Sequence, residues 1–199
     1  MDKLKFKVII GSTRQGRFSD KPGNWIYDEL KEKEEVDAEL LDLRDYPMPF
    51  FDSAVSPSMP GYQISDSTSK KWQEKIGEAD AFIIVAPEYN HGYTAVLKNA
   101  IDMLYKEWNN KVVGFVSYGS AGGSRSIEQL RQVAIELKMF PIHDTISIPH
   151  EIVVSASKEK VPANPELFAP LRSGPRGDRV EAFFNQLLVA AKAMKVTRN

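Results

Sequence analysis

Short apolar runs alternate with longer amphipathic segments along this chain. Four of the runs cover residues 6–10, 38–43, 81–86 and 112–117, and a weaker, alternating run covers residues 142–148. The first, third and fourth runs are nearly continuous and rich in Val, Ile and Phe, which is typical of strands buried on both faces of a parallel sheet.

The segments between these runs carry apolar residues at helical spacing, three to four positions apart. These residues are Trp25, Ile26 and Leu30, then Trp72, Ile76 and Ala79, and then apolar positions within 96–105, 127–137 and 180–191. Five strands that alternate with five helices predict right-handed βαβ units. We therefore expect a single α/β domain over residues 1–199, built on a doubly wound, five-stranded parallel sheet with helices on both faces.

Two long segments lack this periodicity. Tyr46–Gly61 holds four prolines, and Glu151–Asp178 holds another four. Connections of this length inside a compact domain are usually functional or mobile. We expect the 151–178 segment to be irregular, either as an exposed loop or as a contact between subunits. The alternative is an arm that binds a partner protein.

Composition excludes several classes of function. The 199 residues include 26 Lys and Arg against 27 Asp and Glu, so the net charge of −1 gives no reason to expect a nucleic-acid or anionic-membrane partner. There is no cysteine, which excludes disulfides, thiol nucleophiles and thiolate metal sites. No apolar stretch approaches the roughly 20 residues of a membrane span, and no signal peptide is recognisable. We expect a cytoplasmic protein.

Ligands of doubly wound sheets bind beyond the carboxyl ends of the strands, so the segments that follow the apolar runs are the candidate site. The first, Gly11–Ser19, combines glycines, hydroxyl groups and two arginines before a helix, which suits a phosphate group. The alternative is an ordinary polar loop in which Ser19 caps the helix. No G-x-G-x-x-G and no P-loop motif is present, so a single phosphate, as in a mononucleotide, fits better than a pyrophosphate.

Two further loops follow the third and fourth predicted strands. Pro87–Tyr93 brackets a turn with proline and glycine, and its amide and aromatic groups can stack beside a flat heterocycle. The alternative is a purely structural turn with Thr94 as the helix cap. Ser117–Arg125 offers backbone amides on a glycine-rich loop, although such a loop can also be merely flexible.

Four motifs carry a resemblance to a known family. They are GSTRQGRFS (11–19), DLRDYPMPFFD (42–52), PEYNHGYTAVLKNAID (87–102) and SYGSAGGSR (117–125). In their order and spacing, the sequence resembles the NADPH-dependent FMN reductases, flavodoxin-like proteins that include flavin, quinone, azo-dye and chromate reductases. The resemblance spans about residues 4–140 and implies the strand order 2-1-3-4-5. Many relatives have proline in place of Thr94. This difference could change how the second substrate reaches the flavin edge, more than it changes FMN binding.

The resemblance implies a set of cofactor-binding residues for FMN. The FMN phosphate would fall to Ser12, Arg14, Arg17 and Ser19. The flavin ring would lie against Pro87, Glu88, Tyr89 and Asn90, with further contacts from Ser117, Tyr118, Gly119, Gly122 and Gly123. Phe50 and Phe51 are candidates for the mouth of the site, although one of them could equally belong to the core.

The implied activity is an NAD(P)H-dependent, FMN-containing oxidoreductase. NADPH, or NADH, would deliver hydride to N5 of FMN, and a small acceptor such as a quinone, flavin, azo compound or metal oxyanion would then take the electrons in a ping-pong cycle. No side chain need act as a nucleophile or an essential base, so we expect no catalytic residue in that sense. The alternatives are a flavodoxin-like electron carrier and an FMN-binding redox sensor.

Metal and hydrolase chemistry find no support in the sequence. The three histidines, His91, His143 and His150, lack ligand spacing, and no serine segment matches G-x-S-x-G. We expect no metal site. Relatives are commonly homodimers or homotetramers, which implies a homo-oligomer here. Residues 106–108 are a candidate interface element, although Trp108 could equally pack on its own domain.

Overall fold

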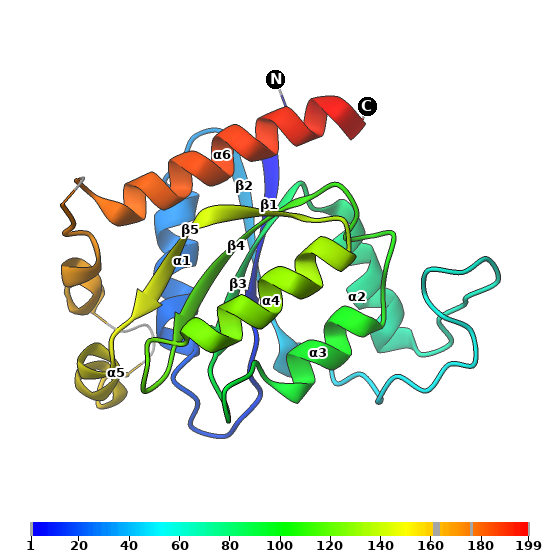
Figure 1. Cartoon of the computed structure of the whole chain (residues 1–199), viewed down its shortest axis with the longest axis horizontal. Coiled ribbons are helices and arrows are strands. Elements are labelled where there is room, and N and C mark those ends of the chain that lie inside the picture. The colour runs from blue at the N-terminus through cyan, green and yellow to red at the C-terminus, as the bar shows by residue number, and fades with distance from the viewer. Residues whose placement is uncertain (1, 161–163, 176, 199) are drawn as a thin grey trace.

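The structure is a computed structural model that describes residues 2–160, 164–175 and 177–198. Five parallel strands form one sheet in the order β2-β1-β3-β4-β5 (Figure 1). The strands are β1 Leu4–Ile10, β2 Val36–Asp42, β3 Ala81–Pro87, β4 Val112–Tyr118 and β5 Phe140–Ile148. The predicted flavodoxin-like fold class and strand order are confirmed.

Helices cover both faces of this sheet. They are α1 Asp20–Lys31, α2 Ser67–Glu78, α3 Ala95–Asp102, α4 Ser124–Glu136, α5 His150–Ser157 and α6 Arg179–Arg198, with short 3-10 helices at η1 Leu43–Asp45 and η2 Pro165–Leu171. The first core layer contains α1 and α6, and the second contains α2, α3 and α4. Every residue of β3 and β4 is buried, which explains why their sequences are apolar without alternation.

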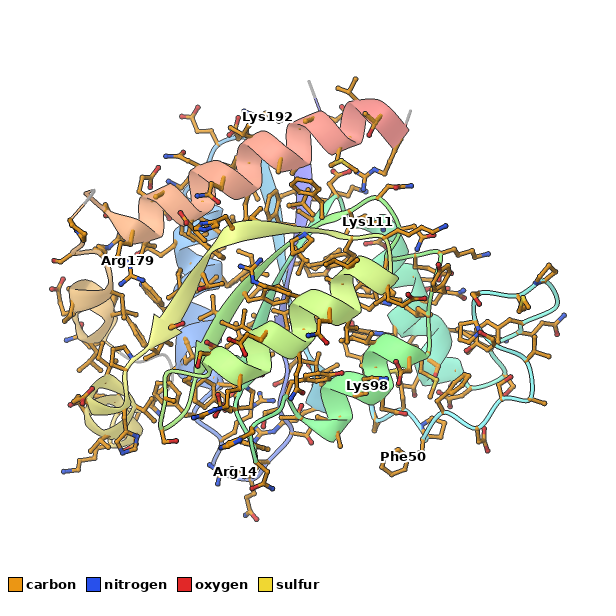
Figure 2. All side chains as sticks on the ribbon, in the orientation of Figure 1. Arg14, Phe50, Lys98, Lys111, Arg179 and Lys192 are labelled. Carbon is orange, nitrogen blue, oxygen red and sulfur yellow. The ribbon has the colours of Figure 1, made fainter. Side chains whose placement is uncertain are left out.

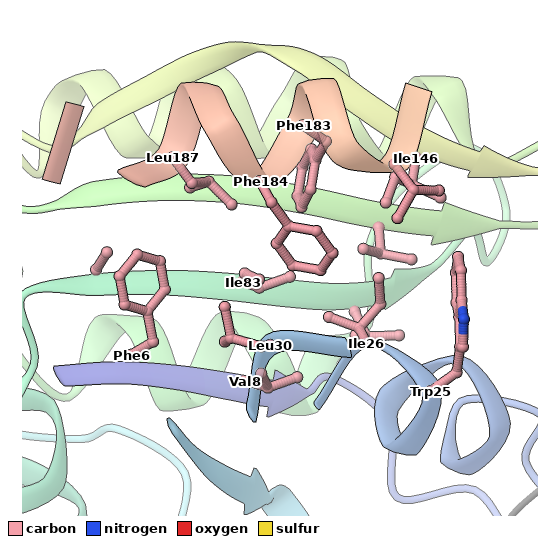
Figure 3. Packing of buried hydrophobic residues seen from close by; sticks show 14 of the residues in the cluster. Phe6, Val8, Trp25, Ile26, Leu30, Ile83, Ile146, Phe183, Phe184 and Leu187 are labelled. Atoms are coloured by element: carbon pink, nitrogen blue, oxygen red, sulfur yellow. The ribbon is translucent and has the colours of Figure 1, made fainter. Parts of the chain in front are cut away.

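The layer under α1 and α6 shows how the sheet is held. Phe6 and Ile83 point from the strands towards Leu30 of α1 and towards Phe183 and Phe184 of α6 (Figure 3). Phe183, Phe184 and Leu30 are at most 1% exposed. A large aromatic side chain buried in this way contributes about 2–3 kcal/mol relative to an exposed one.

Two elements differ from the sequence prediction. The third helix ends at Asp102 rather than near Tyr105, because Trp108 turns back into the core and donates its indole N–H to the Ile101 carbonyl over 3.2 Å. Trp108 is fully buried beside Trp72 and Phe82, so this residue of the candidate interface element packs within its own chain.

The 151–178 segment is more regular than predicted. It contains most of α5 and all of η2, because the ring of Phe168 stacks on that of Trp25 with centroids 4.5 Å apart and Ala156 is fully buried. Residues 161–163 and 176 lie outside the described part of this segment. The roles considered for it, as an interface or a partner arm, remain predictions.

The proline-rich segment after β2 remains irregular, as predicted. Residues 49–65 extend away from the sheet, beyond α2 and α3, and appear in cyan at the right of Figure 1. Within the described residues, no helix is long and apolar enough to cross a membrane.

Candidate functional site

The three predicted loops meet at the carboxyl edge of the sheet. They follow β1, β3 and β4, which are neighbours in the sheet order. The Gly11 amide donates to the Val85 carbonyl over 2.9 Å, and the Glu88 amide donates to the Tyr118 carbonyl over 2.9 Å. The strand order therefore assembles one site from segments that are about 100 residues apart in the sequence.

Ser12 and Arg14 lie in the first loop, where Ser12 is 1% exposed and Arg14 faces solvent. The Ser12 hydroxyl lies 3.1 Å from the Tyr89 hydroxyl, which joins this loop to the one after β3. Arg14 is exposed, and its guanidinium carbon lies 5.9 Å from the centre of the Tyr89 ring. No carboxylate of the described residues lies within 4 Å of the Arg14 guanidinium. Its charge is therefore available to a ligand anion.

Arg17 is placed differently from the other predicted phosphate ligands. Its side chain is fully buried and forms ion pairs with Asp20 of α1 and Asp42 of β2, and it also donates to the Ser12 carbonyl. Burial alone would lower the pKa of Arg17, but the two carboxylates outweigh it and the pKa is raised. Burial would raise the pKa of Asp42, and the hydrogen bond from Arg17 brings it below its usual value. Arg17 thus fastens the loop to β2 and α1.

Ser19 lies beneath the loop rather than in it. Its hydroxyl is 2.5 Å from the Tyr118 hydroxyl, and both residues are buried. Ser19 occupies the N-cap position of α1, as the alternative interpretation expected, but its hydroxyl makes no cap hydrogen bond to the helix. Burial raises the pKa of Tyr118 strongly, and its phenol therefore stays protonated.

The loop after β3 is a two-residue hairpin turn. Tyr89 and Gly92 exchange both backbone hydrogen bonds, at 2.8 and 3.0 Å, around Asn90 and His91. Asn90 and His91 have φ of 51° and 68°, the left-handed conformation that this tight turn requires. Such conformations in residues other than glycine are strained and concentrate at functional sites. Asn90 and His91 are exposed on the turn.

Glu88 is the anchor of this hairpin. Its side chain, 5% exposed, accepts a hydrogen bond from the Arg125 guanidinium at 2.7 Å and one from the Arg125 amide at 3.1 Å. Burial tends to raise the pKa of Glu88, but the bonds from Arg125 lower it overall, so the carboxylate stays ionised. Pro87, the last residue of β3, accepts a hydrogen bond at its carbonyl from Ser126. The loops after β3 and β4 are therefore tied together through α4.

The glycine-rich loop has one position that only glycine can occupy. Gly123 has φ of 80°, and a Cβ there would lie 2.6 Å from the Ser117 Cβ. Ser117 donates its hydroxyl to the Gly122 carbonyl at 2.7 Å, which closes the loop against the end of β4. Gly119, in turn, approaches Glu88 so closely that a Cβ would stand 3.0 Å from the Glu88 Cβ.

A trough runs beside these loops, between the first loop and α3. It consists of two adjoining cavities of about 480 and 300 Å³ that share Thr13, Met48, Val96 and Asn99. The larger cavity reaches Tyr89 and Phe50, and the smaller one reaches Arg44. Figure 2 shows Arg14 and Phe50 projecting on the same side of the molecule, at the lower edge of that view.

Asn99 lines both cavities of the trough, a position that its place in the LKNAID motif did not predict. Its amide donates to the Pro49 carbonyl at 2.8 Å and accepts from the Phe51 amide at 2.9 Å. This pins the chain on either side of Phe50, which is 79% exposed, while Phe51 is half-buried against Tyr62. The only sequence signal was the position of Asn99 in LKNAID, one turn into a helix that begins at the site.

Neither the described histidines nor the described acidic residues form a metal site. No group of three or more His, Cys, Asp and Glu side chains capable of holding a metal ion occurs in the part of the chain that the structure describes.

The sheet order and the loops at its carboxyl edge define a flavodoxin-like α/β protein. A sequence model of the NADPH-dependent FMN reductase family matches residues 4–152. The chain therefore belongs to this family, as its motifs predicted, and is an oxidoreductase that uses FMN and NAD(P)H.

Several curated proteins are similar over most of the chain. An NAD(P)H-dependent FMN reductase of Schizosaccharomyces pombe is 37% identical over 152 residues, which cover 75% of this chain and 76% of that protein. An NAD(P)H-dependent FMN reductase of Saccharomyces cerevisiae is 34% identical over 77% of this chain and 90% of its own length. A quinone reductase of Escherichia coli is 30% identical over 68% of this chain and 72% of its own.

Solved structures agree on the fold. The flavoenzyme NAD(P)H:(acceptor) oxidoreductase of Paracoccus denitrificans superposes with a TM-score of 0.66 at 17% identity, over 94% of this chain and 98% of that one. An azoreductase of Bacillus anthracis gives a TM-score of 0.56 at 14% identity, over 96% and 98% of the two chains.

Proposed function

We propose that this protein binds FMN across the three loops and reduces a small electron acceptor with NADPH. The observation that carries the proposal is the junction of Ser12 and Arg14 with Tyr89. A cationic, hydroxyl-bearing loop at the start of α1 meets the hairpin on the neighbouring strand end. The donor set suits one phosphate monoester, because it combines an uncommitted guanidinium with a hydroxyl group.

The predicted phosphate ligands divide into two groups in this proposal. Ser12 and Arg14 contact the phosphate in this proposal, since Arg14 is exposed and Ser12, although 1% exposed, lines the larger cavity of the trough. Arg17 and Ser19 support the loop instead of contacting the phosphate. The Arg17 guanidinium is paired with the carboxylates of Asp20 and Asp42. The Ser19 hydroxyl is hydrogen-bonded to the Tyr118 hydroxyl.

The flavin ring has its proposed place along the two remaining loops. The residues that would line it are Pro87, Glu88, Tyr89, Asn90, Ser117, Tyr118, Gly119, Gly122 and Gly123. The support is that the two loops are fastened to each other by the Glu88–Arg125 pair. Gly119 and Gly123 approach Glu88 and Ser117 too closely for a side chain, which keeps this edge free of bulky groups.

When bound, FMN supplies the redox chemistry, accepting hydride from the reduced nicotinamide and passing two electrons on to the acceptor. The chain's own residues bind and orient. Arg14 and Ser12 hold the phosphate, the hairpin positions the ring, and Tyr89, Phe50 and Met48 line the place where a flat substrate stacks. We propose that the nicotinamide and the acceptor use this place in turn, in a ping-pong cycle. A quinone, a flavin, an azo compound and a metal oxyanion are the acceptor classes.

The phosphate assignment is tested by comparing FMN with riboflavin. We expect the wild type to bind FMN at least about 100-fold more tightly than riboflavin. Arg14→Gln should reduce this preference by roughly tenfold or more, while its affinity for riboflavin stays constant. Arg179→Gln, an exposed arginine at the start of α6, is the matched control. If Arg14→Gln lost affinity for FMN and riboflavin equally, Arg14 would not contact the FMN phosphate.

The catalytic cycle is tested by steady-state kinetics at several quinone concentrations. Parallel lines in double-reciprocal plots are expected for alternating occupancy of one place, whereas intersecting lines would require both substrates to bind together. If the FMN-loaded protein turned over none of these acceptor classes, the results would favour an electron carrier or a redox sensor.

The remaining expectations stay predictions. They are a homodimer or homotetramer, a cytoplasmic location, and one domain over residues 1–199. Light scattering of the FMN-loaded protein measures the first of these directly.

A further inference from the structure

Two ends of the trough differ in their chemistry. One end, at Tyr89 and Phe50, offers aromatic rings, and the other, beyond the shared Thr13, offers the guanidinium of Arg44. Between them the walls are largely apolar. A ligand that spans the trough would therefore be flat at one end and anionic at the other.

Arg44 retains hydrogen-bonding capacity at this end. It lies in η1, directly after β2, and its side chain is 39% exposed. One nitrogen donates to the Arg14 carbonyl at 2.7 Å, and another lies 3.6 Å from Asp20, which is longer than a hydrogen bond. A guanidinium carries five N–H donors in a fixed plane, so most of them stay available.

The local charge also leaves room for an anion. Arg17 is paired with Asp20 and Asp42. Asp20 also lies 3.6 Å from an Arg44 nitrogen, and Asp45 follows Arg44 in the chain. Among the described residues, no carboxylate lies within hydrogen-bonding distance of the Arg14 or Arg44 guanidinium. Arg14 and Arg44 are both exposed, so their charges face solvent.

We propose that Arg44, with Thr13 beside it, binds the 2′-phosphate of NADPH and makes the enzyme prefer NADPH to NADH. The inference rests on the proposed function, in which Arg14 already takes the FMN phosphate. A phosphate monoester is the shared chemistry, and it has two sources here, the 5′-phosphate of FMN and the 2′-phosphate of NADPH. Arg14 lines the cavity that reaches Tyr89, whereas the Arg44 side chain, although it donates to the Arg14 carbonyl, lines the adjoining cavity, so Arg44 is assigned to the nucleotide substrate. Arginine suits this task because its planar donors match phosphate oxygens.

The test uses FMN-loaded protein and three variants. Arg44→Gln removes the charge, Arg44→Lys keeps it, and Arg179→Gln removes an exposed arginine outside the trough. Calorimetry measures the binding of NADP⁺, NAD⁺ and 2′-AMP, and kinetics measure kcat/KM with NADPH and NADH. FMN affinity is measured for every variant.

The inference predicts that Arg44→Gln weakens NADP⁺ and 2′-AMP binding and lowers kcat/KM for NADPH by roughly 10- to 100-fold. The values for NAD⁺ and NADH should change less than about threefold, Arg44→Lys should recover part of the loss, and Arg179→Gln should match the wild type. FMN affinity should be unchanged throughout.

Two results would overturn the inference. A loss of FMN affinity with an unchanged NADPH-to-NADH ratio would assign Arg44 to the flavin phosphate. An equal loss with both nucleotides would mean that Arg44 only supports the Arg14 loop. A wild type that retains no FMN contradicts the proposed function instead, and the 2′-AMP titration of Arg44→Gln against the wild type then decides the role of Arg44 separately.

Discussion

The Thr94 hydroxyl donates a hydrogen bond to the Gly11 carbonyl over 2.5 Å and thereby joins the loop after β3 to the loop after β1. The same oxygen accepts the Leu97 amide at 3.2 Å, so Thr94 also caps α3, as the sequence suggested. Proline, which many members of the family carry at this position, can do neither with its side chain. Thr94 therefore replaces the stiffness of proline with a direct tie between the two loops of the site.

Thr94→Val should lower the free energy of unfolding by about 2 kcal/mol, because it removes a helix cap and leaves a buried carbonyl unsatisfied. Urea unfolding followed by circular dichroism measures this change. Thr197→Val, at an exposed position near the end of α6, is the control and should have little effect. A loss below about 0.5 kcal/mol for Thr94→Val would mean that the tie to Gly11 does not stabilise the fold.

Gly123→Ala and Gly16→Ala form a matched pair. Both glycines have left-handed φ values, 80° and 65°, but a Cβ at Gly16 meets nothing within 4 Å, whereas at Gly123 it meets Ser117 at 2.6 Å. Gly16→Ala should cost only the conformational strain, about 1 kcal/mol. Gly123→Ala should cost about 3 kcal/mol, since overpacking is added to the strain. Chemical denaturation of both variants checks the difference, and equal costs would contradict the tight closure of the loop after β4.

Arg17→Met should destabilise the protein by about 3 kcal/mol, because Asp20 and Asp42 would lose the cation between them. FMN affinity should fall with it, since Arg17 also holds the Ser12 carbonyl. Arg14→Gln should weaken FMN binding without a comparable change in stability, because Arg14 is exposed. Thermal unfolding without FMN, set beside FMN titration, separates the two effects. If Arg17→Met left stability intact and affected only FMN, Arg17 would be a direct phosphate ligand.

Lys111 provides a prediction at alkaline pH. Burial, with a smaller contribution from Arg198, lowers the pKa of this lysine from 10.5 to about 8 (its position is labelled in Figure 2). Between pH 8 and about 10.4 the unfolded chain therefore holds the proton that the folded chain has lost, so this group makes the free energy of unfolding rise with pH.

The measurement for Lys111 is the difference in unfolding free energy between the wild type and Lys111→Met at pH 7, 8, 9 and 10. That difference should be constant up to about pH 8 and then increase in favour of the wild type. Lys71→Met, at an exposed position on α2, should show a constant difference throughout. A constant difference for Lys111→Met as well would mean that Lys111 keeps an ordinary pKa.

Much of this architecture could be predicted from the sequence because burial on both faces leaves an uninterrupted apolar signal. Residues 81–86 and 112–117 became the central strands β3 and β4 for this reason. The helix α5 was missed, since it has only eight residues and its run of β-branched residues at 152–154 is more typical of a strand. It is held by tertiary packing, in which Ala156 and Phe168 fill space beside α1.

Part of the candidate site could likewise be predicted from the sequence, and part could not. The positions of Ser12, Tyr89 and Gly123 could be predicted because each comes directly after a strand or in a turn. The burial of Arg17 could not, because its partner Asp42 lies 25 residues away and nothing in GSTRQGRFS distinguishes an arginine that faces a ligand from one that faces a carboxylate. The trough beside α3 was also beyond the sequence, since it depends on how Asn99 holds residues 49–51.

The most direct test of the whole account is the visible spectrum of the protein after reconstitution with FMN and gel filtration, recorded before and after anaerobic addition of NADPH. The account predicts that the flavin bands stay with the protein and bleach rapidly when NADPH is added. Protein that elutes without flavin, or flavin that NADPH leaves oxidised, would contradict it.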